Sequence, residues 1–151
     1  LSVSHGLQLW LEHLVYSACG NQGESRLFVR KDGEWRFPPM DTEQAAAWLG
    51  LYIEGYRQGM NKPLLLLPES GGAWIKACYD AQNDAMLTDD ASLQKARGKF
   101  LQAYEGNMMV RGEGEDVWYQ RLWRTLEPEY YDAITEEAQR YLLPLFKFNQ
   151  S

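Results

Sequence analysis

The sequence is poor in the residues that build metal and nucleophile sites. Its 151 residues include two cysteines, Cys19 and Cys78, and two histidines, His5 and His13. No CxxC pair occurs, which excludes a zinc site built on cysteines. The spacing of the histidines places them on different faces of a helix, so we predict no metal site. We expect two buried free thiols, as in a reducing cytosol; one disulfide in a secreted protein is the alternative.

Long apolar runs are also missing. The longest uninterrupted aliphatic run is Leu64–Leu67, whereas a membrane-spanning helix needs about 20 apolar residues. The first residues show no basic segment followed by an apolar stretch, so we predict neither a signal peptide nor a membrane contact. We therefore expect a cytoplasmic protein. The chain starts at Leu1 rather than Met, which suggests a processed chain or a piece of a longer one.

Positive charge is not in excess. Lysine and arginine total 15 against 21 aspartate and glutamate residues, a formal net charge of −6. A generic polyanion binder needs net positive charge, so only a local basic patch remains possible for nucleic acid. With 45% hydrophobic and 13% aromatic residues, the composition excludes intrinsic disorder. The length fits one domain.

Apolar residues recur at helical spacing in several segments. We expect helices within residues 5–18, 41–59, 70–81, 89–104, 115–126 and 128–143, with Asp41, Ser70 and Asp89 as helix caps. Residues 62–68 fit either a core strand or an apolar linker. The predicted fold class is α+β, mostly helical with one β-hairpin. The predicted division is a domain of residues 1–143 and a tail of residues 144–151, with Pro144 ending the last helix.

The hairpin is predicted around an Asp-Gly turn at residues 32–33. A two-residue type I′ turn pairs Lys31 with Glu34 and Phe28 with Phe37. This register places Phe28, Arg30, Trp35 and Phe37 on one face. Two interpretations stay open, because the aromatic residues of such a face either contact a ligand or pack against helices.

The hairpin is the candidate DNA-binding site. Guanidinium groups neutralise phosphates and aromatic rings stack on bases. The candidate residues are Arg26, Arg30, Lys31, Trp35 and Arg36.

A second surface is predicted to bind a protein partner, since tryptophan, tyrosine and arginine dominate protein interfaces. Within residues 115–126, Trp118 and Leu122 are expected on the buried stripe. The candidate partner-binding residues are Tyr119, Trp123 and Arg124, together with Phe146 and Phe148 of the apolar tail. A plain core helix is the alternative.

No motif points to catalysis. The chain has no Gly-x-Ser-x-Gly sequence and no P-loop. Asp80 and Asp84, with Glu34, resemble the acid sets that hold Mg²⁺ in nucleases. A solvated helix end explains the aspartates better, so we predict no catalytic residues and no cofactor.

Five segments closely resemble the C-terminal end of a known family. They are LWLEHL (Leu9–Leu14), FVRKDGEW (Phe28–Trp35), LLPESGGAW (Leu66–Trp74), AYEGNMMVRGEG (Ala103–Gly114) and LPLFKFNQS (Leu143–Ser151). Together they resemble the RecC family, the gamma subunits of bacterial exodeoxyribonuclease V, the RecBCD helicase–nuclease.

The resemblance implies a scaffold without motor or nuclease activity. It implies RecD and RecB as partners in a heterotrimer that acts on double- and single-stranded DNA in repair and recombination, with ATP and Mg²⁺ bound by the partner subunits. It also implies a degenerate PD-(D/E)xK nuclease-like fold. In that fold Gln8–Leu14 would be the helix after the catalytic strand, whose own residues would precede Leu1. The region that reads Chi would lie elsewhere in the subunit.

Overall fold

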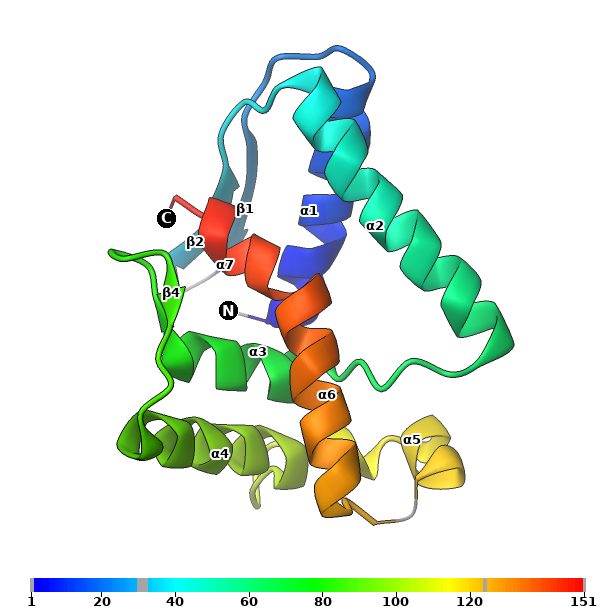
Figure 1. The fold of residues 1–151 in the computed structure, drawn as a ribbon, viewed down its shortest axis with the longest axis vertical. Coiled ribbons are helices and arrows are strands. Elements are labelled where there is room, and N and C mark those ends of the chain that lie inside the picture. The colour runs from blue at the N-terminus through cyan, green and yellow to red at the C-terminus, as the bar shows by residue number, and fades with distance from the viewer. Residues whose placement is uncertain (1, 30–32, 124, 151) are drawn as a thin grey trace. The chain divides into compact units, whose positions relative to one another are not determined.

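The computed structural model describes residues 2–29, 33–123 and 125–150. The fold is α+β, as predicted: it is mostly helical, with two small two-stranded antiparallel sheets in the described residues (Figure 1). The nuclease-like fold implied by the resemblance stays a prediction. The chain divides into two compact units, residues 1–64 with 148–151, and residues 65–147. The boundaries between these units follow residues 64 and 147, whereas the predicted division followed residue 143.

The first unit contains two helices and a hairpin: α1 (Val3–Ala18), β1 (Ser25–Val29), β2 (Gly33–Phe37) and α2 (Thr42–Asn61). Each helix begins at a capping side chain. Ser2 accepts a hydrogen bond from the amide of His5, and Asp41 accepts from the amides of Glu43 and Gln44. Asp41 was the predicted cap, and side-chain acceptors at this position satisfy amides that have no partner within the helix.

Aromatic side chains fill the core of the first unit. Trp10 of α1 and Phe37 of β2 are fully buried, with ring centroids 5.0 Å apart. The two buried indole groups also find acceptors: Trp10 donates to the Tyr52 hydroxyl of α2, and Trp35 donates to the Ser2 carbonyl. The N–H of a buried tryptophan usually finds a hydrogen-bond partner, and these two bonds join α1 to α2 and the hairpin to the N-cap residue of α1.

The hairpin register differs from the predicted one. Val29 pairs with Gly33 and Phe28 with Glu34, so residues 30–32 separate the strands where two residues were predicted. Because side chains alternate along a strand, this shift moves Phe28 to the face opposite Trp35 and Phe37. Gly33 has a φ of 96°, a left-handed conformation that glycine adopts without steric cost.

Gly6 of α1 lies directly against the Trp35 ring. A β-carbon at this position would stand 2.4 Å from Cε2 of Trp35. We therefore expect Gly6→Ala to lower the free energy of unfolding by about 1–2 kcal/mol, although alanine favours helices, because overpacking outweighs propensity. Chemical denaturation followed by tryptophan fluorescence checks this. Gly98→Ala is the control: nothing lies near its β-carbon, so a small gain in stability is expected, and equal effects would contradict the argument.

His13 is a buried histidine whose Nδ1 lies 2.9 Å from the Ser25 hydroxyl. Burial lowers its pKa, so the folded state binds a proton less readily than the unfolded state. The stability linked to His13 is thus present above about pH 6.5 and is lost as pH falls through the lowered pKa. We expect His13→Gln to flatten the pH dependence of unfolding below pH 6.5. An unchanged slope would contradict this.

The second unit is built almost entirely from helices. Its elements are α3 (Pro68–Cys78), β3 (Tyr79–Asp80), β4 (Ala85–Met86), α4 (Asp90–Glu105), the 3-10 helix η1 (Glu113–Glu115), α5 (Val117–Leu122), α6 (Pro128–Tyr141) and α7 (Leu143–Phe148), whose last residue belongs to the first unit. Helix α3 packs on α4 and α6 (Figure 1). A β-carbon on Gly71 would lie 2.8 Å from that of Ala138, so glycine allows the close approach of α3 to α6.

Several predicted boundaries are corrected in this unit. Asp89 caps α4 as predicted, whereas Ser70 lies inside α3, which begins at Pro68. Pro144 lies in the first turn of α7 instead of ending structure there, because proline lacks only the amide that a first turn leaves unpaired. Residues 63–67 form no strand, so the linker alternative holds.

The two cysteines differ in solvent exposure. Both are free thiols, and Cys78 is buried as predicted, whereas Cys19 is exposed at the end of α1. Burial raises the pKa of Cys78 to about 11, which leaves its thiol protonated at neutral pH.

Candidate interaction surfaces

The outer face of the hairpin carries Arg26, Phe28, Glu34 and Arg36. Phe28 is 74% exposed, whereas Trp35 on the inner face is 2% exposed. The indole ring of Trp35 therefore offers no face to a base, and its predicted DNA-stacking role is wrong. Phe28, which the predicted register had placed with the core aromatics, is instead the exposed aromatic of the hairpin.

Glu24 holds both described arginines of this face. One carboxylate oxygen accepts from Nε of Arg26, and the other lies 2.6 Å from Nε of Arg36. These bonds lower the pKa of Glu24 and raise that of Arg26. With Glu34 beside them, the described part of the face is close to neutral. The predicted contacts Arg30 and Lys31 lie outside the described residues.

The aromatic residues near α5 are arranged opposite to the prediction. Trp118 and Leu122 are 70% and 54% exposed, although both were expected in the core. Tyr119 instead donates from its hydroxyl to the Leu66 carbonyl at 2.5 Å, and burial raises its pKa to about 12. Trp123 is half-buried and lines a narrow apolar cavity with Tyr119.

This reversal affects the predicted partner contacts. Tyr119 and Trp123 are largely committed to the interior, and Arg124 lies outside the described residues. Trp118 is the exposed aromatic of the segment, with the Arg121 guanidinium 5.0 Å above its ring. Helix α5 spans only Val117–Leu122, whereas the predicted helix over residues 115–126 was expected to bury one stripe that includes Trp118 and Leu122.

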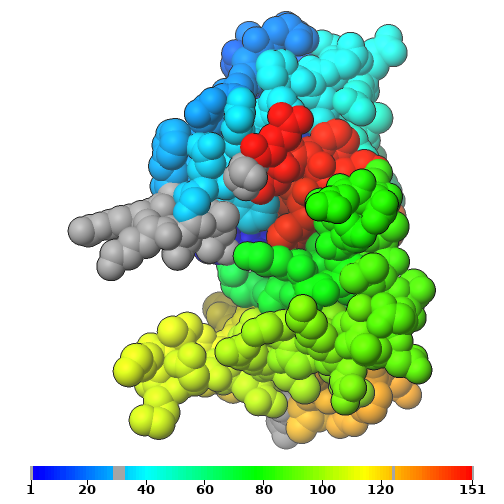
Figure 2. Space-filling model, turned by 90° about the vertical axis from the view of Figure 1, so that its left-hand side faces the viewer, coloured from blue at the N-terminus to red at the C-terminus, as the bar shows by residue number. Residues whose placement is uncertain are grey.

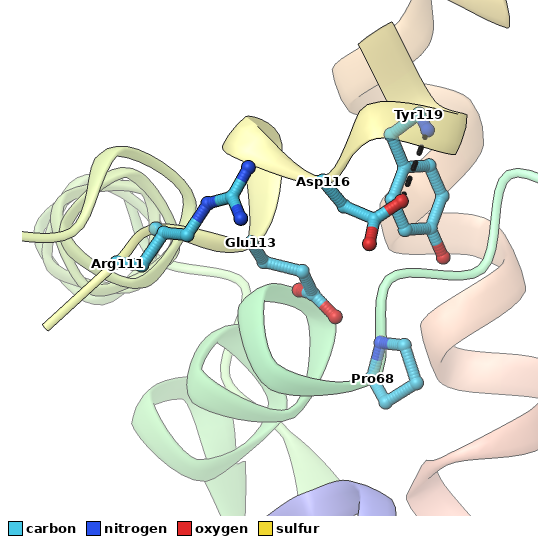
Figure 3. A pocket seen from close by; sticks show the side chains of 6 residues that line it. Pro68, Arg111, Glu113, Asp116 and Tyr119 are labelled. Atoms are coloured by element: carbon cyan, nitrogen blue, oxygen red, sulfur yellow. Dashed lines mark hydrogen bonds between the residues drawn. The ribbon is translucent and has the colours of Figure 1, made fainter. Parts of the chain in front are cut away.

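An open cavity of about 370 Å³ lies beside the start of α3 (Figure 3). Glu113 points from η1 toward this helix end and accepts from the amides of Glu69 and Ser70 at 3.1 and 2.7 Å. Asp116 on the cavity wall accepts from the amide of Tyr119 and caps α5. Both carboxylates therefore act as helix caps, and the cavity shows no uncommitted reactive group.

The acidic residues after α3 form a turn. Asp80 accepts from the amides of Gln82 and Asn83, and Asp84 accepts from the Tyr79 hydroxyl and pairs with Lys147. The hydrogen bond from the Asn83 side chain to Asp80 and the one from Lys147 to Asp84 are the largest of the causes that lower the pKa of these carboxyl groups. Across the described ranges, no group of three or more histidine, cysteine, aspartate or glutamate side chains is placed to hold a metal ion.

Similar proteins define the family. The chain matches the RecC C-terminal domain family over residues 1–79. It is 74% identical over its whole length to the RecBCD enzyme subunit RecC of Escherichia coli (strain K12), of which it covers 14%. The RecBCD enzyme subunits RecC of Buchnera aphidicola from Schizaphis graminum and from Acyrthosiphon pisum are 35% and 33% identical over 93% and 95% of the chain, which covers 13% of each.

The chain belongs to the RecC C-terminal domain family. This confirms the resemblance drawn from the five sequence segments. The chain spans about one seventh of the curated relatives it matches, since it covers 14% of the first of them. Among the described helices of this RecC-family chain, none is long and apolar enough to cross a membrane.

Residues 148–150 of this RecC-family chain pack against side chains and backbone of the first unit. Phe148 stacks on Trp10 with ring centroids 5.3 Å apart and meets the edge of Trp48 at 5.8 Å. The amide of Gln150 donates to the carbonyl of Arg36. Phe148 is thus a structural residue of the first unit, and Phe146 is half-buried. Neither presents the fully exposed apolar group that the tail was predicted to offer.

The loop at residues 107–111 is a surface that the sequence analysis missed. Met108 and Met109 are 104% and 95% exposed, and Val110 is 62% exposed. Figure 2 shows this yellow segment projecting from the second unit. The sequence could have indicated this surface, because three consecutive apolar residues, 108–110, lie between two predicted helices.

Proposed function

We propose that this domain is a non-catalytic docking module of the RecC subunit in the RecBCD enzyme. In this role it binds the RecD and RecB subunits in the cytoplasm during repair of double-strand breaks by recombination. ATP and Mg²⁺ are bound by those partners. The support is the membership of the RecC C-terminal domain family and relatives that are named as enzyme subunits.

The observation that carries the proposal is the apolar tip at residues 107–111. Asn107 accepts from the amides of Met109 and Val110, and a β-bridge joins Gly106 to Arg111. These bonds hold two methionine side chains in solvent on a fixed loop. Methionine adapts to irregular apolar pockets, and a preformed loop loses little entropy on binding. Such a tip is suited to insertion into an apolar pocket of another subunit.

The non-catalytic part of the proposal rests on how the acidic residues are used. Asp80 and Asp84 are held by turn amides, Tyr79 and Lys147, and Glu113 and Asp116 cap helices. A two-metal nuclease instead needs converging carboxylates that are free to bind Mg²⁺. If the purified chain cut DNA with Mg²⁺ and Asp80→Ala abolished this activity, the chain would be a nuclease and not a scaffold.

Co-elution with purified RecD, and separately with RecB, on a sizing column at moderate salt tests the docking role. Wild type is expected to form a complex. The double substitution Met108→Ser with Met109→Ser is expected to weaken it at least about tenfold, as for interface hot spots. Leu87→Ser is the matched control, since Leu87 is another exposed apolar residue of the same unit. Absence of any wild-type complex with both subunits would overturn the docking role.

A second candidate function is contact with DNA through the outer face of the hairpin. It is favoured by the 74% exposure of Phe28 beside Arg26 and Arg36 on this face. An exposed ring flanked by guanidinium groups is the arrangement that binds single-stranded DNA.

DNA contact through the hairpin predicts the direction in which two substitutions change the affinity for single-stranded DNA. Glu24→Gln removes the carboxylate that pairs with both arginines, so it should raise the affinity for single-stranded DNA at low salt, by about two- to tenfold if one or two phosphate contacts are gained. Phe28→Ala should lower the affinity. Fluorescence anisotropy with a labelled oligonucleotide measures both. If the two variants bind no differently from wild type, the hairpin face is not a DNA contact.

A further inference from the structure

A second open cavity, of about 390 Å³, lies among three helices of the second unit. Helix α3 packs on α4 and on α6, and each of the three helices contributes to the lining. Among the lining residues are Trp74 of α3, Gln94 and Arg97 of α4, and Tyr131 and Asp132 of α6. Small-molecule sites are typically cavities of about 300–1,000 Å³, so this cavity has room for a ligand with one ring system.

The aromatic part of the lining is held in place by its neighbours. Trp74 is 6% exposed. The ring of Tyr131 meets that of Phe100 at an angle of 83°, with centroids 5.0 Å apart, and the Arg97 guanidinium lies over the Tyr131 ring, 5.4 Å from its centroid. Arg97 is itself exposed, so the face of its guanidinium away from Tyr131 is accessible to a ligand. A guanidinium held over an aromatic ring is well placed to stack on a second flat group.

Two opposite charges line the cavity without pairing. Among the described residues, the ion pairs include neither Arg97 nor Asp132. The Thr135 hydroxyl donates to the backbone carbonyl of Asp132 and not to its carboxylate. A carboxylate ligand would meet Asp132 and an ammonium ligand would meet Arg97, so the lining disfavours ligands of either charge. It suits a neutral group whose edge carries donors for the carboxylate and acceptors for the guanidinium and the Gln94 amide.

We propose that this cavity binds a nucleobase, supplied either by a free nucleoside or nucleotide or by a single-stranded nucleic acid. A nucleobase is flat and uncharged, and its pairing edge carries both donors and acceptors. In the proposed complex the base stacks on the Arg97 guanidinium, and its edge donates to the Asp132 carboxylate. Proteins bind unstacked bases in this way, with guanidinium planes and aromatic rings as platforms. The site lies in the second unit and depends neither on the docking role nor on the hairpin face.

The sign of one substitution distinguishes a base site from a phosphate site. If the cavity attracted only phosphates, Asp132→Ala would raise the affinity for single-stranded DNA, because it removes a negative charge. Recognition of a base predicts the opposite. The variant loses a hydrogen bond to a charged group, which should weaken binding about tenfold or more.

The full-length subunit, purified without its partners, is the protein to test. The probes are the common 2′-deoxynucleosides, which are uncharged, followed by equilibrium dialysis. We expect Arg97→Ala and Asp132→Ala each to weaken deoxynucleoside binding about tenfold or more. Lys95→Ala and Glu136→Ala are the matched controls, since each removes a charge of the same sign from the same helix at a residue that does not line the cavity. All four side chains are exposed, so the variants should keep the fold, which circular dichroism checks.

A labelled single-stranded oligonucleotide, followed by fluorescence anisotropy, identifies the source of the base. If Asp132→Ala binds this strand more weakly, but binds an abasic strand of the same length as tightly as wild type does, the base belongs to a single strand. If Asp132→Ala weakens only deoxynucleoside binding, the ligand is a free nucleoside or nucleotide. The proposal is overturned if wild type binds none of the probes, or if Asp132→Ala binds all of them as tightly as wild type or more tightly. A protein segment with one acidic and one basic side chain is then the occupant that the lining leaves.

Discussion

Replacing Phe148 by alanine is expected to lower the free energy of unfolding of the first unit by about 2–4 kcal/mol, somewhat less than for a fully buried phenylalanine. Phe148 lies in the segment that was predicted to be a tail, where side chains usually contribute little. Here its ring stacks on Trp10 and meets the edge of Trp48, while the following Asn149 accepts a hydrogen bond from the amide of Arg36. Its removal leaves an unfilled space beside the Trp10 ring.

Urea denaturation followed by tryptophan fluorescence measures this effect; Trp10, Trp35 and Trp48 report on the first unit, and Trp74, Trp118 and Trp123 report on the second. Gln150→Ala is the matched control. Gln150 contributes a backbone amide to the hydrogen bond with Arg36, so removal of its side chain should be close to neutral. If Phe148→Ala is as stable as Gln150→Ala, the last residues are a tail after all.

The C-terminal residues show what a local pattern leaves undetermined. Pro144 predicted an end to regular structure, yet proline is equally compatible with the first turn of a new helix. Phe148 finds its partners on α1 and α2, more than 80 positions earlier in the sequence. Periodicity identifies such a residue as apolar but does not specify the distant rings on which it packs.

The hairpin shows how a small local error changes a functional prediction. Both strands were predicted, and two interpretations of their aromatic face were left open. The register, however, pairs Phe28 with Glu34, and this moves Phe28 to the outer face and leaves Trp35 inside. Because a register shift of an odd number of residues exchanges the two faces, Trp35, the predicted stacking residue, lies inside and Phe28 is the exposed aromatic of the hairpin.

Helix α2 shows the opposite case. Its bounds and its Asp41 cap could be predicted because they depend on local hydrogen bonds and on spacing. Helical spacing alone places its apolar residues on a single stripe, since a helix packed on one neighbour has one. The structure divides them, because Tyr52 accepts a hydrogen bond from the Trp10 indole whereas Tyr56 is 70% exposed. Sequence spacing alone cannot make this division, because Tyr52 and Tyr56 differ in their neighbours and not in their residue type.

Removing the Glu113 side chain is expected to have the largest effect on the second unit. Glu113→Ala should lower its free energy of unfolding by about 1–3 kcal/mol, because the amides of Glu69 and Ser70 lose their acceptor in a partly buried place. Helix α3 starts at Pro68 without a side-chain cap of its own, so Glu113 supplies this cap from the distant η1. Ser70 was predicted to cap this helix, because a capping side chain normally lies next to the helix end that it caps.

Comparison with Glu113→Gln separates the charge from the hydrogen bonds. Burial raises the pKa of Glu113, so the folded state binds a proton more readily than the unfolded state. Wild type should therefore gain stability relative to Glu113→Gln as pH falls from 7 through the raised pKa. At pH 7 the glutamine variant, which keeps an acceptor oxygen without a charge, should be more stable than Glu113→Ala. Denaturation followed by circular dichroism at several pH values measures both differences, and a relative loss of wild-type stability in acid would show that Glu113 acts chiefly as an anion at the start of α3.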